Sequence, residues 1–380
     1  MHERGLRVRL RQSAPIALDA DLECARGELL ALVGPSGSGK STILRAIAGL
    51  LHIREGNIVC DGETWFEAGR RIHLNTRQRR VGIVFQHYAL FPHLSALENV
   101  MEALQEVPMP LRRSKAKDWL ERLHLHGLED RKPAHLSGGQ QQRVAVARAL
   151  AREPRALLLD EPFSAVDRST REKLYEELAG LRRDFSMPVV LVTHDLDEAL
   201  ILADRMSILS QGRTLQTGRP FEVMTRPDTV HVAHLVGQKN IFRAGVIEHS
   251  PERGVTVIEW RGRRLIARLQ AKFAPGSQVA WIIPRSHVVV DTPDRLSEGD
   301  LENQIRGRVF GFVRLGENAA LTIHVDDPSR PPLFVSVPLH LAQRYGIASG
   351  SEIVISFLAE GIHLMPADKA LSPRGIDSGN

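Results

Sequence analysis

Residues 34–41 read GPSGSGKS. Four residues separate Gly34 from Gly39, and Lys40 and Ser41 follow, which is the phosphate-loop pattern. The apolar run before it (26–34, RGELLALVG) predicts a buried strand, and residues 41–51 (STILRAIAGLL) predict a helix. The helix would place Ile43, Leu44, Ile47 and Ala48 on one face. A chance Gly/Ser-rich loop is the alternative, and the strand before the motif and the helix after it both argue against this alternative.

This loop predicts a nucleotide triphosphate site. Glycines let the backbone fold around phosphate oxygens, with amide donors at the N-terminus of a helix. Lys40 is expected to reach the β and γ phosphates, and Ser41 to ligate Mg²⁺ with Thr42 beside it. The whole expected phosphate-binding set is Gly34, Pro35, Ser36, Gly37, Ser38, Gly39, Lys40, Ser41 and Thr42.

A second carboxylate-bearing motif follows an apolar strand. Residues 156–161 read ALLLDE, and the carboxyl end of such a strand is where nucleotides bind in open α/β sheets. Asp160 is expected to hold Mg²⁺ through its water shell, and Glu161 to polarise the attacking water. Alone, a strand that ends in two carboxylates is a weak signal, and the phosphate loop upstream strengthens it.

Residues 136–140 read LSGGQ and precede the helical pattern QQRVAVARALA. Here the sequence resembles the ATP-binding cassette (ABC) family, in which this signature faces the nucleotide of the other subunit. The resemblance implies that Ser137, Gly138, Gly139 and Gln140 contact the γ phosphate at a helix N-terminus. One phosphate loop and one signature in one chain imply a head-to-tail homodimer with two shared ATP sites.

The remaining family motifs occur in order. Gln86 in GIVFQ resembles the glutamine that touches Mg²⁺ and the attacking water, and the following HYALFPH would meet a membrane partner. Asp167 in SAVD matches the loop through which subunits communicate, with Val166 in place of the commoner leucine. His194 in LVTHD matches the histidine that contacts the γ phosphate. The resemblance thus implies four catalytic residues: Lys40, Gln86, Glu161 and His194.

The expected aromatic residue under the adenine base is missing. The family carries one about 25 to 30 residues before the loop lysine, yet no Phe, Trp or Tyr precedes Trp65. Stacking on an aromatic ring contributes on the order of 1 to 3 kcal/mol per base. The sequence therefore predicts weak base discrimination, or a substitute contact from the region of Arg11.

Alternating strand and helix patterns up to about residue 237 predict an α/β fold of the P-loop NTPase type with a mostly parallel sheet. Residues 87–152 have few strand signals and predict an inserted helical subdomain. From residue 238 to 380 the pattern is β-rich, and NIFRAGV (240–246) matches NQIRGRV (303–309). Residues 276 onward also parallel residues 350 onward, so we expect a tandem β-barrel domain with a polar tail beyond Pro366. This domain resembles the OB or TOBE domain that is appended to importer ATPases.

Composition narrows the class of protein. Hydrophobic residues make up 43% and charged residues 25% of the 380, which is ordinary globular usage. The net charge of +5 is dispersed and aromatics are only 5%, which argues against nucleic-acid binding. The two cysteines and the absence of a signal-like or membrane-spanning segment predict a cytoplasmic protein. The family resemblance implies that it lies peripherally at the cytoplasmic face of the membrane, with permease subunits and a periplasmic binding protein as partners.

The cargo stays open. The stretch WFEAGRRIHLNTRQRRVGIVFQ and the tail are similar to those of molybdate importer ATPases, so molybdate or tungstate is the first expectation. Import of sulfate, ferric iron or a polyamine is the alternative. A soluble ABC ATPase or an oxyanion sensor is a rival of another class. The tail either senses oxyanion or only enlarges the dimer interface.

Overall fold

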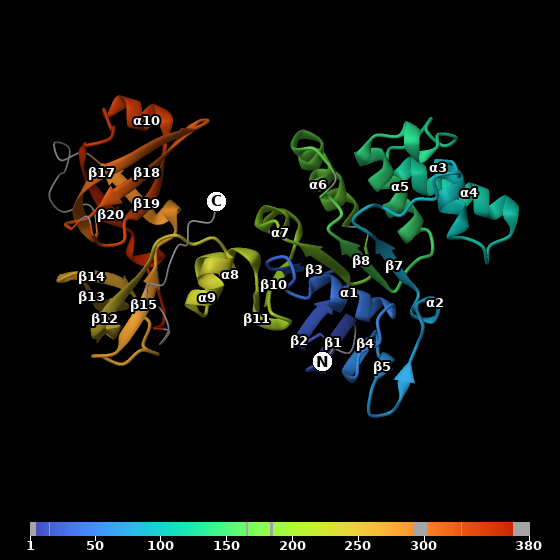
Figure 1. Ribbon diagram of the computed structural model, residues 1–380, viewed down its shortest axis with the longest axis horizontal. Coiled ribbons are helices and arrows are strands. Elements are labelled where there is room, and N and C mark those ends of the chain that lie inside the picture. Colours follow the sequence, from blue (N-terminus) through green and yellow to red (C-terminus); the bar gives the residue numbers. More distant parts are fainter. Residues whose placement is uncertain are drawn as a thin grey trace. The chain divides into compact units, whose positions relative to one another are not determined.

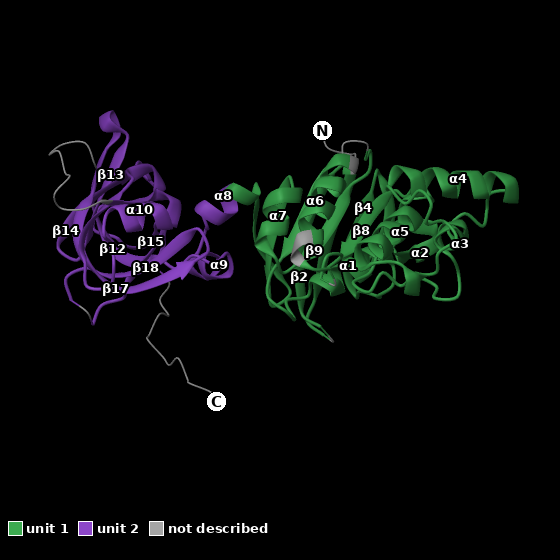
Figure 2. Ribbon diagram, turned by 90° about the horizontal axis from the view of Figure 1, so that it is seen from above, with its two compact units in different colours: residues 1–221 green, residues 222–380 purple. Residues whose placement is uncertain are grey.

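The computed structural model describes residues 5–14, 16–164, 166–182, 185–291, 302–327 and 329–367. The chain divides into two compact units, Met1–Phe221 and Glu222–Asn380 (Figure 2). The division falls within α8 (Pro220–Thr225), earlier than the expected boundary after residue 237. The reason lies in α9 (Val230–Leu235), whose Val230 and Ala233 pack on Ala280, Ile282 and Met365 of the second unit. The polar tail beyond Pro366 lies almost wholly outside the described residues.

The first unit is built on one eleven-stranded mixed sheet in the order β6-β5-β4-β1-β2-β11-β10-β3-β9-β8-β7 (Figure 1). Neighbours from β10 to β7 are parallel, and those from β6 to β2 are antiparallel. The strands are β1 Gly5–Gln12, β2 Leu18–Ala25, β3 Leu29–Val33, β4 Glu55–Cys60, β5 Glu63–Glu67, β6 Ile72–His73, β7 Val81–Val84, β8 Ala156–Asp160, β9 Val189–Thr193, β10 Arg205–Ser210 and β11 Arg213–Gly218.

Burial patterns explain why the sheet is mixed rather than mostly parallel. β3, β8 and β9 are buried along their whole length, as expected for strands with both faces covered. β2 alternates strictly between buried and exposed residues, which is typical of an antiparallel strand with one solvated face. The P-loop NTPase fold expected from the sequence is confirmed, with an antiparallel extension at one side.

Three helices lie between β7 and β8 and pack on one another at the β7 edge of the sheet (Figure 1). They are α3 (Ala96–Glu102), α4 (Met109–Arg122) and α5 (Gly138–Leu150), within the stretch expected to be helical. The other helices of this unit are α1 (Lys40–Ala48), α2 (Thr76–Arg79), α6 (Arg168–Arg182) and α7 (Leu196–Leu202). Ile43, Leu44, Ile47 and Ala48 are buried as the helical pattern predicted.

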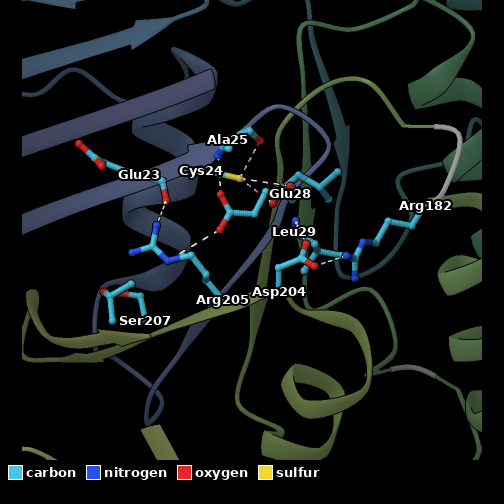
Figure 3. A network of polar contacts seen from close by, with 11 residues as sticks. Glu23, Cys24, Ala25, Glu28, Leu29, Arg182, Asp204, Arg205 and Ser207 are labelled. Carbon is cyan, nitrogen blue, oxygen red and sulfur yellow. Dashed lines mark hydrogen bonds and ion pairs between the residues drawn. The ribbon is translucent and has the colours of Figure 1, made fainter. Parts of the chain in front are cut away.

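A polar network fixes the start of β3, the strand that leads into the phosphate loop (Figure 3). Asp204 Oδ2 accepts a hydrogen bond from the Leu29 amide at 2.8 Å, and the Asp204 amide donates to the Leu29 carbonyl at 3.0 Å. Arg182, in the last turn of α6, pairs with the same Asp204 carboxylate and donates to the Leu202 carbonyl. The C-terminal end of α6 is therefore attached to the base of the phosphate-loop strand.

The second unit contains two five-stranded sheets, in the orders β14-β13-β12-β15-β21 and β16-β20-β17-β18-β19. Their strands are β12 Ile241–Ser250, β13 Val255–Trp260, β14 Arg263–Arg268, β15 Gln278–Ile282, β16 Val288–Asp291, β17 Gln304–Leu315, β18 Asn318–His324, β19 Leu333–Pro338, β20 Glu352–Phe357 and β21 His363–Pro366, with α10 at Leu339–Arg344. The barrel-like β domain expected from the sequence is confirmed.

The two sequence repeats exchange their last strands. β16, which ends the first repeat, pairs with β20 of the second, and β21, which ends the second repeat, pairs with β15 of the first. The apolar residues of both repeats form one core, in which Trp260, Trp281 and Phe357 pack as an aromatic cluster. Neither repeat is complete without the other.

The first asparagine of each repeat joins it to the other repeat. Asn240 Oδ1 accepts from the Phe334 amide at 2.8 Å, and its Nδ2 donates to the Phe334 carbonyl at 2.8 Å. Asn303 makes the same pair of bonds with the Ile266 backbone, at 2.6 and 2.8 Å. Each side chain thus takes the place of a ladder partner for an edge strand of the opposite repeat, β19 for Asn240 and β14 for Asn303.

Replacing Asn240 with alanine should lower the free energy of unfolding of the second unit by about 2 to 4 kcal/mol, because part-buried and buried backbone groups of Phe334 and Ile283 lose their partners. Chemical denaturation followed by tryptophan fluorescence measures it. Asn318→Ala, at the exposed first residue of β18, is the control and should cost less than about 1 kcal/mol. Equal effects of the two substitutions would contradict the role given to Asn240.

Candidate functional site

The phosphate loop joins β3 to α1, and its backbone requires glycine. Gly39 caps α1 in the left-handed region at φ 98°, which costs side-chain-bearing residues energy. A Cβ at Gly34 would lie 2.1 Å from the Leu209 carbonyl oxygen. β10, which carries Leu209, pairs directly with β3. The loop can therefore bend tightly against the neighbouring strand.

Lys40 closes the loop from inside. Its Nζ donates to the carbonyls of Gly34 and Pro35 at 2.7 and 3.0 Å, and the residue is only 5% exposed. Burial lowers the pKa of Lys40, while the nearby carboxylates of Glu161 and Asp160 raise it in part. The ammonium group is thus held within the loop by two carbonyl oxygens, and a cation in this position is suited to an anionic ligand.

Ser41 and Asp160 meet beside the loop. The Ser41 hydroxyl donates to Asp160 Oδ1 at 2.8 Å. The two residues can meet because β9 alone separates β8, which ends at Asp160, from β3, which leads into the loop. Mg²⁺ at phosphate sites usually takes one or two protein oxygens and completes its shell with water and phosphate. This donor pair fits such an ion, and the described residues hold no cluster of three or more His, Cys, Asp or Glu that would form a dedicated metal cage.

Glu161 and His194 are brought together at the ends of two adjacent strands. Glu161 follows β8 with φ 45°, and its amide donates to the Val192 carbonyl at 2.9 Å. Its Oε2 lies 3.3 Å from His194 Nδ1. The two side chains are 22% and 59% exposed, so a water molecule can reach the pair. The carboxylate and the imidazole are therefore close enough to act on one water molecule.

The other expected site residues lie on separate elements. Gln86 follows β7 and is exposed. Ser137 caps α5: its hydroxyl accepts from the Gln140 amide and its amide donates to Gln140 Oε1. Gly138 and Gly139 form the first turn of α5, and Asp167 precedes α6. Within the described part of the chain, the hydrogen bonds of Ser137 and Gln140 stay inside this helix start and do not reach the phosphate loop.

A cavity of about 560 Å³ adjoins the phosphate loop and was only partly anticipated from the sequence. Arg11 was expected there, but the side chains contributed by the turn after β10 were not. Gly212 of that turn donates its amide to the Ser38 carbonyl at 2.9 Å, which attaches the turn to the loop. The sequence signal for this turn was Gly212, which follows the apolar run of β10. The polar lining residues are Arg11, Gln12, Ser13, Asp19, Glu55, Gln211 and Arg213.

Comparison with known proteins places this site. The first unit has the architecture of a nucleoside triphosphatase with a phosphate loop, and residues 18–164 match the family model described as ABC transporter. The Spermidine/putrescine import ATP-binding protein PotA of Methylococcus capsulatus is 39% identical over 305 residues, which cover 80% of this chain and 77% of that protein. PotA of Escherichia coli K12 is 38% identical over 306 residues, with the same coverage.

A solved structure agrees with the sequence relatives. It is that of cbiO1 from Clostridium perfringens, part of the ABC transporter complex cbiONQ, with 28% identity and a TM-score of 0.52 over 57% of this chain and 89% of that one. The chain belongs to the ABC transporter family and is an ATP-binding subunit of the importer type. It is an ATPase that uses ATP with Mg²⁺, and its hydrolysis is coupled to transport.

No described helix of the chain combines the length and apolarity that crossing a bilayer requires.

The cavity beside the phosphate loop leads to a prediction about the base. Its polar lining holds no aromatic side chain, so the free energy of ring stacking is missing. We expect kcat/KM for GTP to lie within about tenfold of that for ATP, since about 1.4 kcal/mol corresponds to a tenfold ratio. Steady-state hydrolysis of both nucleotides measures this. An ATP preference of several hundredfold would contradict it.

Proposed function

We propose that the chain is the motor of an importer and that two copies hydrolyse ATP at two shared sites. The observation that carries this proposal is the separation of two halves of one site. Lys40, Ser41, Asp160, Glu161 and His194 gather at one edge of the sheet. The signature Ser137–Gln140 stands on another element, with Ser137 exposed. A second copy in head-to-tail arrangement brings its signature to the first copy's triphosphate.

Each site residue takes one role in this proposal. The amides of residues 34–41 and Lys40 bind the phosphates, and Ser137, Gly138 and Gly139 of the other copy bind the γ phosphate from the opposite side. Mg²⁺, when bound, neutralises phosphate charge, and Ser41, Asp160 and Gln86 would hold it. Glu161 orients the attacking water, and His194 stabilises the charge that develops on the transferring phosphoryl group.

Asp167 lies in the loop before α6, where the two copies exchange information about their sites. Its Oδ1 accepts from the Thr170 amide at 3.0 Å, and its carbonyl accepts from the Arg171 amide at 2.9 Å. The loop is thereby held at the N-terminus of α6. A movement of the neighbouring copy against this loop therefore acts first on the N-terminus of α6.

A groove beside β7 is the proposed docking site for the permease. It has a volume of about 460 Å³, and its lining includes Phe85, Ala89, Phe91 and Arg148. Phe91 is 43% exposed, and Arg148 stacks on its ring and donates to the Ala89 carbonyl. The groove lies directly after Gln86 along the chain, so the docked subunit is connected with the site by a few residues. This arrangement places the chain peripherally at the cytoplasmic face of the membrane.

For the cargo, we propose a polyamine. The relatives that match 80% of this chain, including most of the second unit, are named for spermidine and putrescine import. Polyamine import was the alternative in the sequence analysis. Molybdate was the first expectation there, and the names of the relatives do not support it.

Uptake in cells tests this proposal. A strain that lacks the chain is supplied with either the wild-type chain or the Glu161→Gln variant, and entry of radiolabelled putrescine, spermidine and molybdate is measured. Polyamine entry with the wild type alone supports the proposal. Molybdate entry with the wild type alone would contradict the polyamine proposal, while it would still support ATP-driven import. Equal entry of every substrate with both chains would contradict the motor itself.

A further inference from the structure

Two helices connect the loop of Asp167 with the strand end that carries His194. α6 begins directly after Asp167, and α7 begins two residues after His194. The two helices contact each other. They lie on the same side of the sheet (Figure 1). A contact between α6 and α7 therefore connects the loop of Asp167 with His194 of the same copy.

Arg171 makes the first connection. Its Nη2 donates to the Val166 carbonyl, directly before Asp167, at 3.1 Å. Its Nη1 lies 3.6 Å from Asp195 Oδ2, directly after His194. Both side chains are about 70% covered, with exposures of 28% and 31%, so solvent screens this ion pair less than an open one. One guanidinium thus contacts both loops.

Asp195 uses its two oxygens for different purposes. Oδ1 accepts from the Asp197 amide at 2.8 Å and caps α7, while Oδ2 faces Arg171. The Asp195 amide donates to the Thr193 hydroxyl at 2.9 Å. The backbone on both sides of His194 is therefore fixed, and only the Oδ2 contact depends on α6.

Tyr175, one turn further along α6, makes the second connection. Its hydroxyl lies 3.1 Å from Glu198 Oε1 on α7, and both residues are 4% exposed. Burial raises the pKa of Tyr175, and the Glu198 carboxylate raises it further, so the phenol remains protonated and donates. Two contacts one helical turn apart hold α6 against α7 without freedom to rotate about either contact.

The far end of α6 is fixed as well. Arg182 pairs with Asp204, which in turn binds the first residue of the phosphate-loop strand (Figure 3). Because α6 has contacts at both of its ends, we expect it to shift as a rigid body when its N-terminal end is displaced. Displacement of the Asp167 loop must therefore change the position of Asp195 and, with it, the neighbouring His194.

We propose that Arg171 is a positioning residue that sets His194 against Glu161 according to the state of the Asp167 loop, with the Tyr175–Glu198 bond as its support. This inference rests on the proposed function, since it concerns how the ATP site of one copy responds to the presence of the second copy. A further observation agrees with it: Arg171 Nε is buried and has no partner among the described residues. An unsatisfied buried donor favours a rearranged state in which it is paired.

Asp195→Asn tests the ion pair with little harm to the fold. Asparagine keeps the Oδ1 acceptor and is as good a helix cap as aspartate, but it replaces Oδ2 by an amide donor that cannot accept from Arg171. We expect kcat for ATP to fall about tenfold with KM unchanged, since residues that share a network couple to this extent. Asp197→Asn, an exposed position two residues on, removes the same charge and should change kcat less than about twofold.

A double-mutant cycle separates positioning from a general structural effect. In a His194→Ala background, Asp195→Asn should have no further effect on single-turnover hydrolysis, because the residue that it positions is gone. Multiplying effects of the two substitutions would overturn the proposal, as would a fall in kcat matched by Asp197→Asn or explained by a lower Tm. A wild type without ATPase activity would instead reject the proposed function.

Discussion

Glu161→Gln should bind ATP with nearly unchanged affinity yet hydrolyse it about 100 to 10,000 times more slowly, the range that a positioned acid or base contributes. Glutamine has the size of glutamate, so the turn after β8 and its Val192 hydrogen bond remain. What is lost is the carboxylate that accepts from water and that lies 3.3 Å from His194 Nδ1. Single-turnover phosphate release and equilibrium nucleotide binding measure the two quantities separately.

The matched control is Glu176→Gln on α6, an exposed glutamate in the same unit. It should leave both quantities within about twofold of the wild type, as surface substitutions usually do. Near-normal turnover of Glu161→Gln would remove this residue from the mechanism. Loss of ATP binding would instead give it a structural part in the phosphate site.

The parts of the site that the sequence predicted well are local in the chain. The phosphate loop, its strand and its helix lie within 29–48, and their apolar pattern and glycines suffice to place them. Ser41 and Asp160 were each expected to hold Mg²⁺, which requires their two strands to be close, and the sheet order places only β9 between β3 and β8. The 2.8 Å contact between these two residues follows from that order.

Other features depend on pairing between distant segments, and local patterns carry no information about it. The antiparallel strand β2 alternates strictly between buried and exposed residues, but nothing in this pattern tells which strands of the sheet it pairs with. The lining of the cavity beside the phosphate loop combines Arg11 of β1, Glu55 of β4 and Gln211 of the turn after β10. Its composition is visible only in the folded chain.

The second unit shows the same limit in a different form. The repeat that begins at Asn240 and Asn303 was visible in the sequence and indicated two copies of one β unit. The exchange of β16 and β21 between the copies was not. The strand pattern of each repeat is the same for pairing within the repeat and for pairing with the other one, so the pattern alone carries no information about this exchange.

Mixing two inactive variants should restore ATP hydrolysis if the sites are shared. Lys40→Ala removes the cation that lies inside the phosphate loop. Ser137→Arg adds a bulky side chain at an exposed position, at a cost of about 1 kcal/mol for the lost helix cap. Each variant alone should show less than about 1% of wild-type activity, since charge-assisted phosphate contacts are lost in both.

In a head-to-tail pair, one copy's Lys40 and the other copy's Ser137 bind the same triphosphate. A mixed pair therefore carries both substitutions in one site and none in the other. Random pairing makes half of the pairs mixed, so the mixture should regain about a quarter of wild-type activity if the two sites work independently, and less if they must fire together. A control mixture of Lys40→Ala with Glu161→Gln stays inactive, because both residues belong to the same half of the site and each mixed pair then has a defect in both sites. No restoration in the first mixture would mean that each chain completes its site alone. Restoration in the control would mean that Lys40 and Glu161 serve different sites of the pair.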